Sequence, residues 1–113
     1  MSVPRITKED LKARLDAGEP LVILDAHLKY PYEHSTVTLP RAVRVAPGAE
    51  VPPIPAGRDV VVFDSDPDEL SSAPLVALLV KRGQRAAALK GGLPEWIGAN
   101  FPVEPKTPPP AEE

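Results

Sequence analysis

The sequence predicts a single α/β domain with a mainly parallel central sheet flanked by helices. Two four-residue runs, at 21–24 and 60–63, are entirely apolar, which is typical of parallel strands covered on both faces. In the second half of the chain, helical and strand patterns alternate, which favours crossover connections between parallel strands. The 113 residues suffice for one hydrophobic core and are too few for two.

The first helix is predicted for residues 8–17. Thr7 has the side chain of an N-cap, and Asp10 supplies the acidic residue three positions later. Ile6 and Leu11 flank this start at the spacing of a hydrophobic staple. The helix should therefore be fixed at its amino end by both a cap and an apolar contact.

Four segments follow before the second apolar run. The first apolar run ends in Asp25 and is expected to be a strand. Residues 30–39 show no periodic pattern and are expected to be irregular. Residues 42–45 alternate and predict a short strand, whereas residues 47–57 are rich in proline and glycine and predict a loop.

A second helix is indicated by the pattern of residues 75–82. Pro74 fits only in its first turn, where a missing N–H is harmless. We therefore expect the helix to begin near Ser71 or Ser72, either of which could cap it. A competing start at residues 66–69 would leave Pro74 inside the helix as a kink.

The last part of the chain predicts one strand, one short helix and a tail. Residues 86–89 have small side chains and are expected to lie inside the sheet. A Gly-Gly pair then turns the chain into a helix at 94–99, in which Trp96 is expected to anchor the core. We assign the domain to residues 1–105 and a proline-rich, disordered or extended tail to residues 106–113.

Composition excludes several classes of function. The net charge of −3 does not favour nucleic acid or an anionic membrane as partner. No apolar run approaches the roughly 18 residues of a membrane span, and the first ten residues lack the apolar stretch of a signal peptide. We therefore expect a cytoplasmic protein. The absence of cysteine excludes disulfides, thiolate catalysis and cysteine-based metal sites in this chain.

Over most of its length the sequence resembles the rhodanese-like domains. The likeness covers residues 6–104 and lies in four segments. Residues 21–25 resemble the family's apolar strand ending in Asp, and residues 60–64 resemble the strand before its active-site loop. A "His-Ile-Pro-Gly-Ala" turn of the family is matched by Thr38-Leu39-Pro40-Arg41-Ala42, and its "Gly-Gly … Trp … Pro-Val" signature is matched by Gly91-Gly92-Leu93 with Trp96 and then Phe101-Pro102-Val103-Glu104. The resemblance implies a single rhodanese-like domain.

The chain departs from the family at the residues that carry its chemistry. Asp64 stands where the resemblance places the catalytic cysteine, and His27 stands where a basic residue often follows the strand-ending Asp. The histidine and glycine of the turn are replaced by Thr38 and Arg41. If Ser72 corresponds to the small residue that ends the loop, the loop is longer than in typical sulfurtransferases.

These departures bear directly on sulfur transfer. In active members the resemblance implies a persulfide on the cysteine, stabilised by loop N–H groups and the following helix N-terminus. The carboxylate of Asp64 cannot accept sulfane sulfur. The hydroxyl of Ser65 is a weak nucleophile unless a base activates it, and neither His27 nor His34 is recognisably paired with it. We therefore expect no catalytic residue and no thiosulfate sulfurtransferase activity.

The loop between the second apolar run and the second helix is acidic. Its carboxylates could cap that helix, bind a hard cation or form a recognition surface. Capping is the interpretation that we prefer, and we expect no metal and no cofactor. The predicted function is a catalytically inactive module for binding or regulation that contacts an unidentified protein partner. The alternative is an enzyme or ion-binding protein that uses the loop carboxylates. The candidate binding residues are Asp64, Ser65, Asp66, Asp68, Glu69, Ser71 and Ser72.

Overall fold

The computed structural model describes residues 3–27, 37–45, 50–55, 57–65 and 72–105. Its centre is a five-stranded sheet in the order β1-β6-β5-β2-β4, in which every neighbouring pair is parallel. The strands are β1 (Arg5–Ile6), β2 (Val22–Asp25), β4 (Ala42–Arg44), β5 (Val60–Phe63) and β6 (Ala86–Leu89). The predicted α/β domain with a mainly parallel sheet is confirmed, including the interior position of β6.

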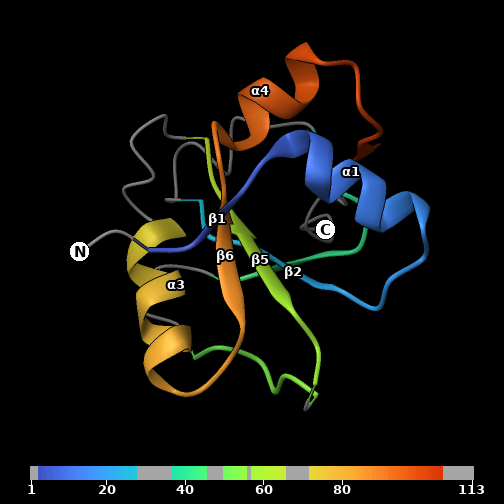
Figure 1. The fold of residues 1–113 in the computed structure, drawn as a ribbon. Coiled ribbons are helices and arrows are strands. Elements are labelled where there is room, and N and C mark those ends of the chain that lie inside the picture. The colour runs from blue at the N-terminus through green and yellow to red at the C-terminus, as the bar shows by residue number, and fades with distance from the viewer. Residues whose placement is uncertain (1–2, 28–36, 46–49, 56, 66–71, 106–113) are drawn as a thin grey trace, which may run out of the picture.

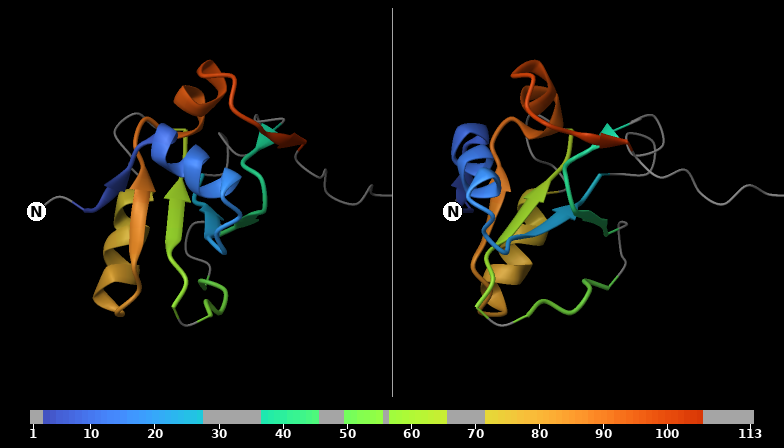
Figure 2. Two further views of the ribbon diagram at one scale, coloured as in Figure 1. Left: turned by 45° about the vertical axis from the view of Figure 1, so that its right-hand side comes forward. Right: turned by 90° about the vertical axis from the view of Figure 1, so that its right-hand side faces the viewer.

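Helices cover both faces of this sheet (Figures 1 and 2). Helix α3 (Ser72–Lys81) lies on one face, and helices α1 (Lys8–Asp16) and α4 (Gly92–Gly98) lie on the other. Alternation along β5 explains why both faces are apolar. Val61 and Phe63 belong to the core beneath α1 and α4, whereas the valines at 60 and 62 belong to the core beneath α3.

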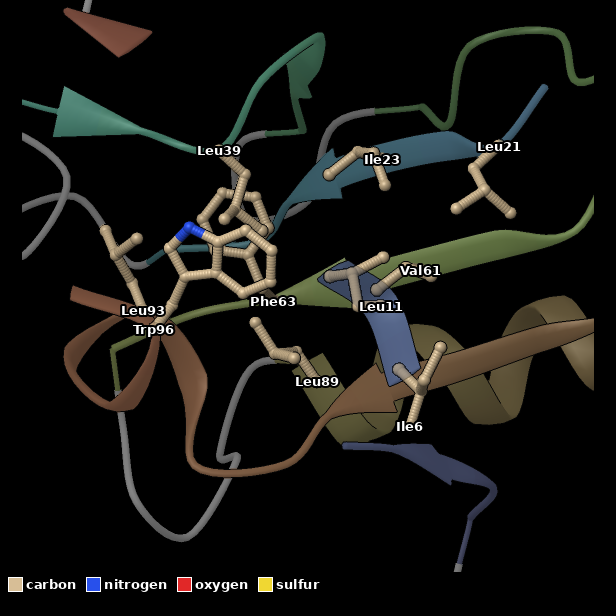
Figure 3. Close-up of a cluster of buried hydrophobic side chains, with 10 residues drawn as sticks. All are labelled: Ile6, Leu11, Leu21, Ile23, Leu39, Val61, Phe63, Leu89, Leu93 and Trp96. Atoms are coloured by element: carbon tan, nitrogen blue, oxygen red, sulfur yellow. The ribbon is translucent and has the colours of Figure 1, made fainter. Parts of the chain in front are cut away.

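Trp96 anchors the core beneath α4. Figure 3 shows its indole among the side chains of Phe63, Leu39 and Leu93. The side chain is fully buried, and its ring meets that of Phe101 edge to face at 5.0 Å. Its Nε1–H donates to the carbonyl oxygen of Pro102 at 2.7 Å. Because the polar atom of the ring is satisfied, burial of the large apolar ring is favourable. The predicted anchor is confirmed.

Helix α1 begins as its sequence predicts. Thr7 is the N-cap, and its hydroxyl accepts a hydrogen bond from the N–H of Asp10 at 3.1 Å. Ile6 and Leu11 lie buried in the same cluster. The helix ends at Asp16, one residue before the predicted limit. The capping residue therefore fixes the amino end closely, and helix ends are ordinarily uncertain by a residue or two.

Three short strands depart from the predicted elements. Residues 37 and 38, expected to be irregular, form β3 (Val37–Thr38), which pairs antiparallel with β7 (Glu104–Pro105). Strand β1 was also not predicted. A strand of two residues is too short to show alternation, so pairing with a neighbouring strand decides its conformation.

Helix α3 begins at Ser72, which places Pro74 in the first turn as predicted. The competing start at 66–69 lies outside the described residues, as does the predicted tail at 106–113. None of the described helices is long and apolar enough to cross a membrane.

Candidate functional site

The parallel register of β2 and β5 brings two polar strand ends together. Asp25 is the register partner of Phe63, and the N–H of Ala26 donates to the carbonyl oxygen of Phe63 at 2.9 Å. Counting two residues beyond this pair places His27 beside Ser65. The carboxyl ends of neighbouring parallel strands are where open α/β sheets usually bind ligands. The site is therefore built from β2, β5 and the residues that follow them.

Asp64 is buried directly after β5 and is held by its neighbours. The residue is only 2% exposed. Its Oδ2 accepts a hydrogen bond from the backbone N–H of Ser72 at 2.8 Å. Its carbonyl oxygen accepts the N–H of Leu93, also at 2.8 Å. A carboxylate that accepts the first N–H of α3 stabilises the helix through both the hydrogen bond and the helix dipole. Asp64 thus has the geometry of a helix cap.

His27 makes hydrogen bonds through both ring nitrogens. The residue is 1% exposed. Its Nδ1 lies 2.5 Å from Oδ1 of Asp25, and its Nε2 is hydrogen-bonded to Oγ of Ser65. The expectation that no histidine is paired with Ser65 is therefore wrong. The contact depends on the register of β2 and β5, which pairs Asp25 with Phe63 and which no local sequence pattern reveals.

Arg44 supports this group from β4. Its Nη1 donates to the carbonyl oxygen of His27 at 2.6 Å and lies 3.9 Å from Oδ1 of Asp25. The guanidinium therefore places positive charge beside the buried carboxylate of Asp25. A charge that is taken out of water requires such partners. Neither Asp25 nor Arg44 was identified as a site residue from the sequence, although the register of the two strands would have indicated Asp25 and His27.

The predicted binding loop is only partly described. Asp64, Ser65 and Ser72 are among the described residues; Asp66, Asp68, Glu69 and Ser71 lie outside them. Asp64 and Ser72 are buried, whereas Ser65 is partly exposed. The buried pair supports the ends of the loop, and Ser65 reaches solvent. Over the described ranges, no three His, Asp or Glu side chains gather in a way that could hold a metal ion.

A separate group of charges lies at the opposite end of β5. Asp59 accepts hydrogen bonds from Nη2 of Arg14, at 2.7 Å, and from Nε of Arg85. Both hydrogen bonds lower the pKa of the Asp59 carboxyl, and the one from Arg14 has the larger effect. These three residues border an open groove of about 720 Å³ beside β1, β5 and β6. Asp59 is thus an ion-pair partner distant from the site at Ser65.

The structure is similar to solved structures of one fold. The BH2092 protein of Bacillus halodurans has a TM-score of 0.77 and 17% identity, over 91% of this chain and 77% of that one. The rhodanese-like domain of the Alr3790 protein of Anabaena has a TM-score of 0.73 and 27% identity, over 97% and 88%. A thiosulfate sulfurtransferase of Pseudomonas aeruginosa has a TM-score of 0.70 and 25% identity, over 93% of this chain and 21% of that one.

No protein-family model and no curated protein matches the sequence. The structural likeness nevertheless confirms the rhodanese-like fold that the sequence predicted. In this chain the fold occurs without any cysteine.

Proposed function

We propose that this rhodanese-like domain without a cysteine is a binding module that does not transfer sulfur. Its contact surface would be the carboxyl ends of β2 and β5 together with the loop from residue 64 to residue 72. The observation that carries the proposal is the position of Asp64. The residue that follows β5 is a buried carboxylate bonded to the N–H of Ser72, so it stabilises the scaffold where an active member would hold its nucleophile.

The capping hydrogen bond also argues against chemistry on Asp64 itself. An aspartyl nucleophile or a cation ligand needs a carboxylate oxygen that faces the ligand. Oδ2 of Asp64 instead accepts the first N–H of α3, and leaving that N–H unsatisfied would cost about 1–3 kcal/mol. The alternative of a carboxylate-based enzyme or ion-binding site at this residue is therefore the weaker proposal.

A protein partner is favoured by what the loop offers. Ser65, at the start of the loop, is partly exposed. Asp66, Asp68 and Glu69 give the loop three further carboxylates in its sequence. Such a segment is complementary to a basic surface, because opposite charges guide association and select partners. We propose a partner protein that presents Lys or Arg side chains to this end of the sheet.

The test is affinity capture with two variants of equal charge. The loop variant carries Asp66→Asn, Asp68→Asn and Glu69→Gln. The matched control carries Glu9→Gln, Asp16→Asn and Glu95→Gln, three exposed acids elsewhere on the domain. We expect the loop variant to lose a partner that the wild type and the control retain. Identical partners for all three proteins would contradict the proposal.

A further inference from the structure

We propose that Ser65 is an activated nucleophile that accepts an acyl group from a neutral ester, with His27 as its general base and Asp25 as the residue that positions His27. This inference goes beyond the proposed function, because a binding surface needs no nucleophile. It is carried by one chain of hydrogen bonds from a buried carboxylate, through a buried imidazole, to the hydroxyl of a partly exposed serine.

The first link of this chain fixes the imidazole. Oδ1 of Asp25 lies 2.5 Å from Nδ1 of His27 and also accepts the backbone N–H of His27 at 2.9 Å. The ring of His27 meets that of Phe63 edge to face at 5.6 Å. The backbone hydrogen bond holds the carboxylate of Asp25 in place, and the bond at Nδ1 together with the aromatic contact orients the imidazole.

The second link sets the direction of proton transfer. An ionised carboxylate only accepts hydrogen bonds, so Nδ1 of His27 carries the proton that faces Asp25. In the neutral ring Nε2 is then the acceptor. The hydroxyl of Ser65 therefore donates to Nε2. This is the arrangement by which a histidine removes the proton of a serine as that serine attacks a carbonyl carbon.

Burial distinguishes this group from an ordinary surface network. Asp25 and His27 are 3% and 1% exposed, whereas Ser65 is partly exposed. The base and its positioning residue thus lie in the protein interior, where electrostatic interactions are strong, and the residue that carries the reacting oxygen is partly exposed. Arg44 adds a cation near Asp25, at 3.9 Å from Oδ1, which gives the buried carboxylate a partner of opposite charge.

The charges of the site favour a neutral substrate. Asp64 precedes Ser65 in the chain, and Asp25 lies behind His27. These two carboxylates outweigh the positive charge of Arg44 beside Asp25, and the negative balance disfavours an anionic donor such as thiosulfate or a phosphate ester. An uncharged carboxylic ester meets no such repulsion, and it supplies both the electrophilic carbon and the leaving alcohol.

The proposed reaction is hydrolysis in two steps. Oγ of Ser65 bonds to the ester carbonyl carbon, while its proton passes to Nε2 of His27. The bond to the alkoxy group then breaks, and His27 returns the proton to the leaving alcohol. Water attacks the acyl group on Ser65 and gives its proton to Nε2; the bond to Oγ breaks, and the proton returns to Ser65. Ester and water thus become alcohol and carboxylic acid, with no change of oxidation state.

Labelling with an uncharged fluorophosphonate tests the nucleophile. Oγ of Ser65 bonds to phosphorus, fluoride leaves, and the proton leaves with it. We expect mass spectrometry to find one adduct on Ser65 in the folded protein. The adduct should be absent after unfolding in urea and in Ser65→Ala, whereas Thr7→Ala, which removes an exposed hydroxyl at the start of α1, should be labelled like the wild type. Absence of label from Ser65 would overturn the proposal.

The dependence on the base distinguishes activation from mere exposure. Asp25→Asn and His27→Gln should each lower the labelling rate of Ser65 by about a hundredfold, the usual contribution of general-base catalysis. An unchanged rate in both variants would overturn the proposal. Hydrolysis of p-nitrophenyl acetate should follow the same order across the variants.

A second measurement leaves the buried pair intact, in case its variants do not fold. Ser65→Cys introduces the only thiol of the chain, because the sequence contains no cysteine. Beside His27 this thiol should form a thiolate at lower pH than a free cysteine. We expect it to react with iodoacetamide about tenfold faster near neutral pH than the same variant in urea. An equal or slower reaction would overturn the proposal and leave the proposed binding function unaffected.

Discussion

Gly92 lies against the carbonyl oxygen of Asp64. A Cβ atom at position 92 would lie 2.4 Å from that oxygen, and the residue has a φ of +68°. The close approach allows the neighbouring N–H of Leu93 to donate to the same oxygen at 2.8 Å. Glycine at position 92, the first residue of α4, is thus required by the strand end that carries the site, and no bound anion is needed to explain it.

Gly92→Ala should destabilise the domain strongly. The substitution adds a steric clash with backbone to the strain of a positive φ, and we expect a loss of about 3 kcal/mol or more. Gly83→Ala is the matched control, since Gly83 has a φ of +86° but open space around it; it should cost only about 1 kcal/mol. Urea unfolding of both variants measures the difference. Equal losses would show that the contact with Asp64 is unimportant.

The sequence predicted the elements whose causes are local. Thr7 caps α1 because a threonine hydroxyl can satisfy a free N–H, and Pro74 limits where α3 can begin. Strands β2 and β5 were predicted because both faces of a central parallel strand are apolar. In contrast, β1, β3 and β7 owe their conformation to distant partners, which no local pattern reveals.

The site was predicted only in part, because one of its residues has a local sequence signal and the others depend on distant partners. Asp64 was located from the end of an apolar run, which is a local signal. The contact between His27 and Ser65 joins residues 38 positions apart and depends on the register of two strands. A shift of one residue in that register separates the two side chains. The chemistry of Ser65 therefore could not be inferred until the register was known.

Asp64→Ala should destabilise the amino end of α3. Loss of the carboxylate leaves the N–H of Ser72 without this acceptor, and we expect a loss of about 1–2 kcal/mol. Asp64→Asn retains a side-chain oxygen and should lose less. Urea unfolding compares the two variants, and hydrogen exchange at Ser72 reports the helix end directly. Equal stability of wild type and Asp64→Ala would exclude a capping role.

Arg41→Gly should stabilise the domain. Arg41 is exposed and has a φ of +62°, a region that is costly for a residue with a Cβ. Glycine removes that strain but loses more freedom on folding, so we expect a net gain of about 0.5 kcal/mol. Asn100→Gly should gain less, because asparagine tolerates its φ of +60°. A lower melting temperature for Arg41→Gly than for wild type would contradict this assignment.

The ion pairs of Asp59 should make stability depend on pH in acid. Hydrogen bonds from Arg14 and then Arg85 lower the pKa of Asp59 in the folded state. The contribution of Asp59 to the free energy of unfolding is therefore fully present above the pKa of the unfolded state, about 3.9. It is lost as pH falls through the lower pKa of the folded state. Wild type should exceed Asp59→Asn by about 1 kcal/mol near neutral pH. The difference should vanish in strong acid, and a constant difference would exclude ionisation as its cause.

Asp64→Cys should not restore sulfur transfer, even though it returns a thiol to the position of the family's nucleophile. The substitution leaves the carboxylates of Asp66, Asp68 and Glu69 in the loop sequence, and these disfavour both an anionic donor and the thiolate form of the new cysteine. It also removes the carboxylate that accepts the N–H of Ser72. A thiosulfate–cyanide assay should therefore read zero for wild type and for Asp64→Cys.

Adding Asp66→Asn, Asp68→Asn and Glu69→Gln to Asp64→Cys separates the two causes, the loop charges and the lost cap of α3. Activity in this combined variant alone would assign the block to the loop charges. Strong turnover by the single variant would show that only the nucleophile had been lost.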